Sequence, residues 1–303
     1  MNRTLQKKLG QILSLAAIVS LLAGNGPAIA AKGEPARQNF QVGQPLQAPG
    51  ITLPQGTVIV EVQRADVTGD RVPDDVLLVG KPLSDNPSYY RPLSVVVRDG
   101  KSGQFSALPD TRTGQYLAGY EPSMFIGDFS GDKVGDVMVT VATGGSGGTS
   151  NHLIATWTSG KPSVIFGEQE NQGLKITGKY LDGFKAELYS PVLDKSFLVD
   201  VSGLKEQYIQ AKVYDASGKY IYRDPNRGNQ RNAADIFSDP FSVLTPTDVN
   251  QDGVYELRGM QSVWGPFHVL TFTQVASTWA YRGGKWQVTD AQYTLTYPIT
   301  AGK

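Results

Sequence analysis

One nine-residue pattern occurs three times in this 303-residue chain, and it restricts the possible folds more than any other feature. The copies occupy residues 66–74, 128–136 and 248–256, and their positions 1, 5 and 9 are acidic every time. An apolar, strand-like run follows each copy. The first aspartates of successive copies lie 62 and 120 residues apart, so the second interval is close to twice the first. Repetition at a fixed interval is typical of folds built from successive copies of one small unit.

Most of the remaining sequence has the pattern of short strands separated by turns. Strand-like runs are found at residues 57–63, 75–80, 93–100, 136–143, 152–158, 196–203, 207–215, 268–281 and 286–297. Turn signals such as Asp99-Gly100 and Ser217-Gly218 separate them. We predict an all-β domain over residues 52–303. About four strands in each repeat favour a β-propeller-like arrangement of about four to five blades, and a simple β-sandwich is the alternative.

The interval between the second and third copies has room for one more, degenerate copy. Residues 180–188 are the candidate, but they lack the acidic pattern. We therefore expect no metal there.

The first thirty residues have the three parts of a secretory signal peptide. A basic start is followed by an apolar run over residues 11–23 and by small residues around a cleavage site after Ala30. The apolar run is shorter than the roughly 20 residues that a membrane span requires. We expect residues 1–30 to be removed on export, and residues 31–51 to form a linker or a disordered N-terminus.

Composition limits the partners and the chemistry. The chain has no cysteine, which excludes disulfides and thiolate metal sites. It has 28 basic and 28 acidic residues, and loss of the signal peptide with its three basic residues would leave a net charge of −3. A mildly acidic chain without a basic patch is not expected to bind nucleic acid. We expect the mature protein to be secreted and to have no membrane span.

The repeated pattern has the chemistry of a calcium-binding loop. Calcium takes about six to eight oxygen ligands from carboxylates, carbonyls and water. Side-chain oxygens at positions 1, 3, 5 and 9 could converge on one ion, and the backbone carbonyl of position 7, always valine, could join them. Without a cation, three carboxylates in one small loop would repel one another. The sequence therefore predicts two to three Ca2+ ions, in preference to magnesium with its stricter octahedral geometry. The predicted ligands are Asp66, Thr68, Asp70, Val72 and Asp74; Asp128, Ser130, Asp132, Val134 and Asp136; and Asp248, Asn250, Asp252, Val254 and Glu256.

These loops and their flanks resemble the FG-GAP, or VCBS, repeats of β-propellers of the integrin α-subunit type. Residues 75–82 are similar to the strand and turn that follow the calcium loop in that family. The resemblance implies a propeller with metal in a hairpin on one rim. Position 6, usually glycine in the family, is Arg71 and Lys133 in the first two copies and Gly253 in the third. The chain also resembles small VCBS-repeat proteins exported by spore-forming Gram-positive bacteria, for which no clear activity is implied.

Other motifs favour structural interpretations. Residues 144–148 match G-x-S-x-G, but a strand-like run follows them instead of the helix that a nucleophile elbow needs. His152 and His268 each begin an apolar strand run and have no metal-ligand pattern around them. The four tryptophans suit strands and blade cores. Tyr89-Tyr90, in a polar stretch, is the candidate for an exposed aromatic contact.

Together these observations predict a non-catalytic, calcium-binding extracellular module with a binding or structural role at the cell or spore surface. Its partner would be an unknown extracellular protein or glycan. Two alternatives remain open at this point. One is a hydrolase or lyase that acts on extracellular polysaccharide through a pair of carboxylates on a propeller scaffold. The other is an adhesin for carbohydrate or cell wall.

Overall fold

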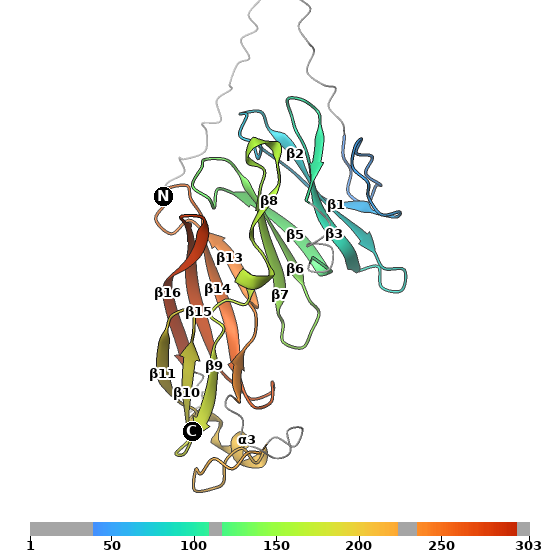
Figure 1. The fold of residues 1–303 in the computed structure, drawn as a ribbon. Helices are drawn as coiled ribbons and strands as arrows, with labels where there is room; N and C mark the ends of the chain where they lie inside the picture. Colours follow the sequence, from blue (N-terminus) through green and yellow to red (C-terminus); the bar gives the residue numbers. More distant parts are fainter. Residues whose placement is uncertain (1–38, 109–116, 224–234, 296–303) are drawn as a thin grey trace, which may run out of the picture. The chain divides into compact units, whose positions relative to one another are not determined.

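The computed structural model describes residues 39–108, 117–223 and 235–295, which form two large antiparallel β-sheets (Figure 1). The predicted signal peptide, residues 1–30, lies outside the described residues, as does the first part of the predicted linker. The prediction of an all-β protein is confirmed, because only short helices interrupt the strands. The described helices are η1 (Thr158–Gly160), α2 (Glu168–Asn171), η2 (Ser202–Leu204) and α3 (Lys205–Gln210).

The first sheet, blue to green in Figure 1, has the strand order β1-β2-β3-β5-β6-β7-β8, with β4 paired to β3. Its strands are β1 (Val58–Ala65), β2 (Asp74–Pro82), β3 (Tyr89–Arg98), β4 (Phe105–Ala107), β5 (Gly119–Gly127), β6 (Asp136–Ala142), β7 (Ser150–Thr156) and β8 (Ser163–Phe166).

The second sheet, yellow to red, has the order β11-β10-β9-β12-β14-β15-β16, with β13 paired to β14. Its strands are β9 (Thr177–Leu181), β10 (Lys185–Ser190), β11 (Lys195–Asp200), β12 (Ile236–Ser238), β13 (Val243–Thr247), β14 (Glu256–Trp264), β15 (Thr271–Arg282) and β16 (Lys285–Leu295).

Three four-stranded antiparallel meanders repeat within these sheets. They are β1–β4, β5–β8 and β13–β16, and in each one successive strands pair with their neighbours. Each meander has one acidic loop between its first and second strands. The repeated motif therefore marks a repeated structural unit.

The segment between the second and third meanders has a different structure. Residues 180–188, the degenerate candidate copy, form the β9–β10 hairpin, in which Gly183 and Phe184 have positive φ. The run at residues 207–215 is predicted as a strand, but its first four residues belong to helix α3. Its apolar residues, at positions 208, 209, 211, 213 and 214, fit a short strand or a short helix, so tertiary contacts decide the outcome. Tyr208 is fully buried and its hydroxyl lies 3.2 Å from that of Tyr180.

Strand β2 is buried on both faces, which explains its continuous apolar sequence. Val76 and Leu78 enter one core cluster, whereas Leu77 and Val79 enter another on the opposite face. A third cluster lies around the second sheet and includes Phe129 of the second acidic loop. All described residues belong to one structural unit.

The described part of the predicted linker packs against the first sheet. Phe40, Leu46, Ala48 and Leu53 cover the outer face formed by β1, β2 and β3. Backbone hydrogen bonds join residues 43 and 44 to Ile59, and Pro45 forms a bridge with Val58. Residues 39–53 are therefore a strap over the sheet.

Candidate metal site

Each set of five predicted ligand residues lies in a separate loop. Loop 1 (residues 66–74) joins β1 to β2, loop 2 (residues 128–136) joins β5 to β6, and loop 3 (residues 248–256) joins β13 to β14. We number the residues of each loop as positions 1 to 9. All fifteen predicted ligands lie within the part of the chain that the structure describes.

The acidic side chains organise the backbone in the same way in all three loops. The position 1 carboxylate accepts the N–H of position 6 at 2.8–3.0 Å. The position 5 carboxylate accepts the N–H of position 7 at 2.8–2.9 Å. The position 9 carboxylate accepts the N–H of position 2 at 2.9–3.1 Å, and in loops 1 and 2 also that of position 3 at 3.0 Å. The shared sequence pattern thus encodes a shared hydrogen-bond pattern.

The backbone angles repeat as well. Positions 4 and 6 have positive φ in every loop. The N–H of position 6 donates to the position 1 carboxylate in all three loops, and that of position 4 does so in loops 1 and 2. Such angles are strained for side chains other than glycine. The residues concerned are Gly69 and Arg71, Gly131 and Lys133, and Gln251 and Gly253.

We expect Arg71→Gly and Lys133→Gly to stabilise the protein slightly. The left-handed conformation costs an L residue roughly 1–2 kcal/mol, and greater freedom of glycine in the unfolded chain removes part of that gain. The free energy of unfolding should rise by about 0.5–1 kcal/mol in each variant, measured by urea denaturation. Gly253→Ala is the matched control and should lower it by a similar amount. A loss of stability in Arg71→Gly would mean that the arginine side chain makes a stabilising contact.

Burial makes the position 9 carboxylates electrostatically unusual. Asp74 and Asp136 are both fully buried, and this burial raises the pKa of each carboxyl above its ordinary value. The nearby Asp132 carboxylate raises the pKa of Asp136 further. Glu256 in loop 3 is only partly buried. A cation beside these carboxylates would favour their charged form.

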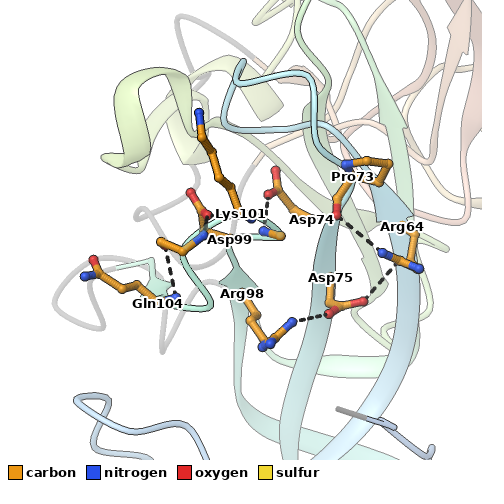
Figure 2. A network of polar contacts seen from close by, with 10 residues as sticks. Arg64, Pro73, Asp74, Asp75, Arg98, Asp99, Lys101 and Gln104 are labelled. Carbon is orange, nitrogen blue, oxygen red and sulfur yellow. Dashed lines mark hydrogen bonds and ion pairs between the residues drawn. The ribbon is translucent and has the colours of Figure 1, made fainter. Parts of the chain in front are cut away.

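Asp75, the residue after Asp74, is a buried acid whose charge is balanced by arginines. Figure 2 shows Asp75 between Arg64 and Arg98, at 3.3 and 3.2 Å. Asp74 points instead to the turn after β3, where the N–H of Gly100 donates to its Oδ1 at 2.8 Å. Among the described residues, no lysine or arginine forms an ion pair with any acid of the three loops. Their negative charge therefore has no compensating basic side chain in this part of the chain.

Loop 2 contains two buried oxygens without a hydrogen-bond partner among the described residues. They are Ser130 Oγ and Asp136 Oδ1, at positions 3 and 9; the nearby Thr156 hydroxyl lowers the pKa of Asp136 somewhat but forms no hydrogen bond of normal geometry with it. Buried polar atoms are rarely left without a partner. Both positions are predicted calcium ligands, so the residues present fit a cation at this loop.

The acidic side chains of the three loops are not gathered into a preformed metal site in the described residues. In the described ranges, no three acidic or histidine side chains form a cluster with the spacing of a metal site. Most carboxylate oxygens face backbone N–H groups of their own loop. A carboxylate has about four lone-pair sites, so an oxygen that accepts one N–H can still bind a cation.

The exposed aromatic contact predicted at Tyr89-Tyr90 is not an exposed pair. Both residues are half-buried, since Tyr90 packs on the core of the first sheet and Tyr89 packs edge-on against Tyr120 with ring centroids 5.0 Å apart. The G-x-S-x-G segment joins β6 to β7 as a hairpin loop, in agreement with its structural interpretation. His152 is buried, with Nδ1 2.9 Å from Thr140 Oγ1.

The sequence did not indicate a polar cluster in the second sheet. His268 Nε2 lies 2.8 Å from Asp239 Oδ2, and Trp264 Nε1 donates to Asp239 Oδ1 at 2.9 Å. A Cβ atom on Gly147 would lie 3.3 Å from His268 Nε2, so the glycine loop approaches this cluster closely. Asp239 lies 29 residues from His268, and no local motif announces the contact.

No helix within the described residues is long and apolar enough to cross a membrane. Residues 174–294, which contain nearly all of the second sheet, match the YybI C-terminal domain family. An uncharacterized protein, YybI of Bacillus subtilis (strain 168), is 31% identical over 224 residues, which cover 73% of this chain and 79% of the relative. The similarity extends well beyond the C-terminal domain. On this similarity, the chain belongs to the YybI family.

Proposed function

We propose that this protein is a calcium-stabilised, non-catalytic β-sheet module that acts outside the cytoplasm as a binding or structural element at the cell or spore surface. The observation that carries the proposal is the triple occurrence of one loop, with the same hydrogen bonds and the same positive-φ positions. Loop 2 adds two buried oxygens that lack a partner among the described residues. The partner would be an extracellular protein or glycan.

The number of acidic residues in the loops favours a bound cation over the alternative that the loops are simple turns. A turn needs one capping carboxylate, but each loop has three acids. In loops 1 and 2, the position 9 acids are buried although burial disfavours their charged form. Calcium bound by positions 1, 3, 5, 7 and 9 would offset this repulsion, and it would stabilise the folded state because the unfolded chain has no such site.

The repeated meanders support a propeller-like architecture. Four-stranded antiparallel units repeated along a chain are the building blocks of propellers. We propose that β1–β4, β5–β8 and β13–β16 correspond to three blades of FG-GAP type, each with its calcium loop between the first and second strands. The β9–β12 segment, with its extra helices, would replace a regular blade.

Calcium titration tests this function directly. The exported protein, stripped of metal with a chelator, should bind two or three calcium ions by calorimetry, and its melting temperature should rise with calcium. Magnesium at the same concentration should have a much smaller effect. The triple variant Asp70→Asn, Asp132→Asn, Asp252→Asn is the matched control, and it should lose both responses. Absence of heat and of any melting shift in the unaltered protein would refute the proposal.

A further inference from the structure

The three acidic loops contact one another in order, through the same hydrogen bond each time. The N–H of Gly135 donates to the carbonyl of Asp66 at 3.1 Å, and the N–H of Tyr255 donates to the carbonyl of Asp128 at 2.7 Å. In both cases position 8 of one loop holds position 1 of the preceding loop. Asp128 and Val254 also form a parallel β-bridge between loops 2 and 3. We call the contacts between loops 1 and 2 and between loops 2 and 3 the two junctions.

An apolar contact repeats at the same two junctions. A Cβ atom on Gly69 would lie 3.1 Å from Val134 Cγ2, and one on Gly131 would lie 4.0 Å from Val254 Cγ2. The valine of position 7 thus lies over the glycine of position 4 in the preceding loop. This contact explains a valine at position 7 in loops 2 and 3 although a calcium ligand there needs only a carbonyl.

One peptide group connects two neighbouring sites at each junction. The carbonyl of Val134 and the N–H of Gly135 belong to the same planar unit, as do the carbonyl of Val254 and the N–H of Tyr255. The carbonyl is the predicted position 7 ligand of its own loop. The N–H fixes the backbone of the aspartate that begins the preceding loop.

We propose that these two peptide groups couple the three calcium sites, so that calcium binding is positively cooperative between adjacent loops. The inference rests on the proposed calcium function. A cation on the carbonyl polarises the peptide and makes its N–H a stronger donor. The strengthened hydrogen bond orders Asp66 or Asp128, whose carboxylates are position 1 ligands, so the preceding loop then binds with a smaller loss of conformational entropy.

Repulsion between bound cations acts against this coupling, and the two effects respond differently to salt. Charges further apart than the Debye length, about 8 Å at 0.15 M salt, are largely screened. The hydrogen bonds of Gly135 and Tyr255 join partly buried backbone groups in direct contact, so salt screens them much less. Cooperativity should therefore persist, or increase, when the salt concentration is raised.

Proteins with chosen active loops provide the test. Asp70→Asn, Asp132→Asn and Asp252→Asn inactivate loops 1, 2 and 3 without large changes of shape. Proteins that keep loops 1 and 2, or loops 2 and 3, should bind the second ion about fivefold or more tightly than the single-loop proteins bind theirs, in calorimetry at 0.15 and 0.5 M KCl. The protein that keeps loops 1 and 3 is the matched control, and its two sites should be independent.

A charge-conserving variant separates structural coupling from a change in charge. Asp132→Glu keeps the carboxylate but displaces its oxygens, and it should weaken the sites in loops 1 and 3 as Asp132→Asn does. Hydrogen exchange of the unaltered protein gives a second readout that needs no variant. The amides of Gly135 and Tyr255 should exchange more slowly in calcium.

The outcomes distinguish this inference from the function on which it rests. Independent sites in the paired-loop proteins, with unchanged exchange at Gly135 and Tyr255, would overturn the coupling and leave calcium binding intact. No binding by the unaltered protein would overturn the proposed function itself.

Discussion

Asp136→Ala should lower the free energy of unfolding by about 3 kcal/mol even in the presence of a chelator. The carboxylate accepts the N–H groups of Phe129 and Ser130 at 2.9 and 3.0 Å, in a fully buried position. Each hydrogen bond to a charged group contributes about 1.5–3 kcal/mol, and relief of the buried charge offsets part of the loss. Urea denaturation in EDTA measures the effect.

Asp136→Asn is the matched control for this prediction. Its amide oxygen can still accept the two N–H groups, and it places no charge in the interior. We expect Asp136→Asn to be about as stable as the unaltered protein in EDTA, but to lose the stabilisation that calcium gives to loop 2. Equal destabilisation in both variants would mean that the negative charge itself stabilises the apo protein.

Acidification should destabilise the protein through His152, by about 3 kcal/mol between pH 7.5 and pH 4. Burial lowers the pKa of this imidazole from 6.5 to about 4. The unfolded chain therefore takes up a proton below pH 6.5 that the folded protein excludes, so stability falls as the pH falls from 6.5 toward 4. The expected loss at pH 5.5 is about 1.4 kcal/mol.

His152→Asn isolates this contribution. The raised pKa of Asp74 and of Asp136 gives a pH dependence of the opposite sign, because the folded protein binds those protons more readily than the unfolded chain. The free energy of unfolding of both proteins is measured by urea denaturation at each pH. Subtracting the value for His152→Asn from that of the unaltered protein cancels the contribution of Asp74 and Asp136 and leaves that of His152. A difference that does not change with pH would contradict a depressed pKa at His152.

The parts of the fold that the sequence predicts are those that local pattern determines. Strands β2 and β6 are largely apolar runs that are mostly buried on both faces, and they are found where the pattern places them. Strand β3 is predicted only in its second half, where its residues are buried. Strand β5 is not predicted because it contains Pro122, which is unusual within a strand, and because its buried residues do not alternate regularly with exposed ones. Helix α3 is predicted as part of a strand because the short run around Tyr208 fits either structure, and the packing of Tyr208 against Tyr180 and Tyr214 is not evident from the sequence.

The candidate metal site likewise has a local part that the sequence predicts and a non-local part that it does not. Spacing of the acids identifies all three loops, since each loop is made from consecutive residues. The contact of Gly135 with Asp66 joins segments 69 residues apart, and nothing in either segment specifies the other. The stacking of the loops, the Asp239–His268 pair and the compensation of Asp75 by Arg98 are non-local for the same reason.

The strap over the first sheet has a consequence for how copies of this protein behave at high concentration. Strand β1 is the terminal strand of that sheet, and an open terminal strand is a template on which a second molecule can add a strand of its own. The strap occupies this position through residues 43–45, and Pro45 has no N–H with which to extend the pairing outward. The chain thus covers the open edge of β1 with a segment of its own, so a second molecule would have to displace the strap before it could pair with β1.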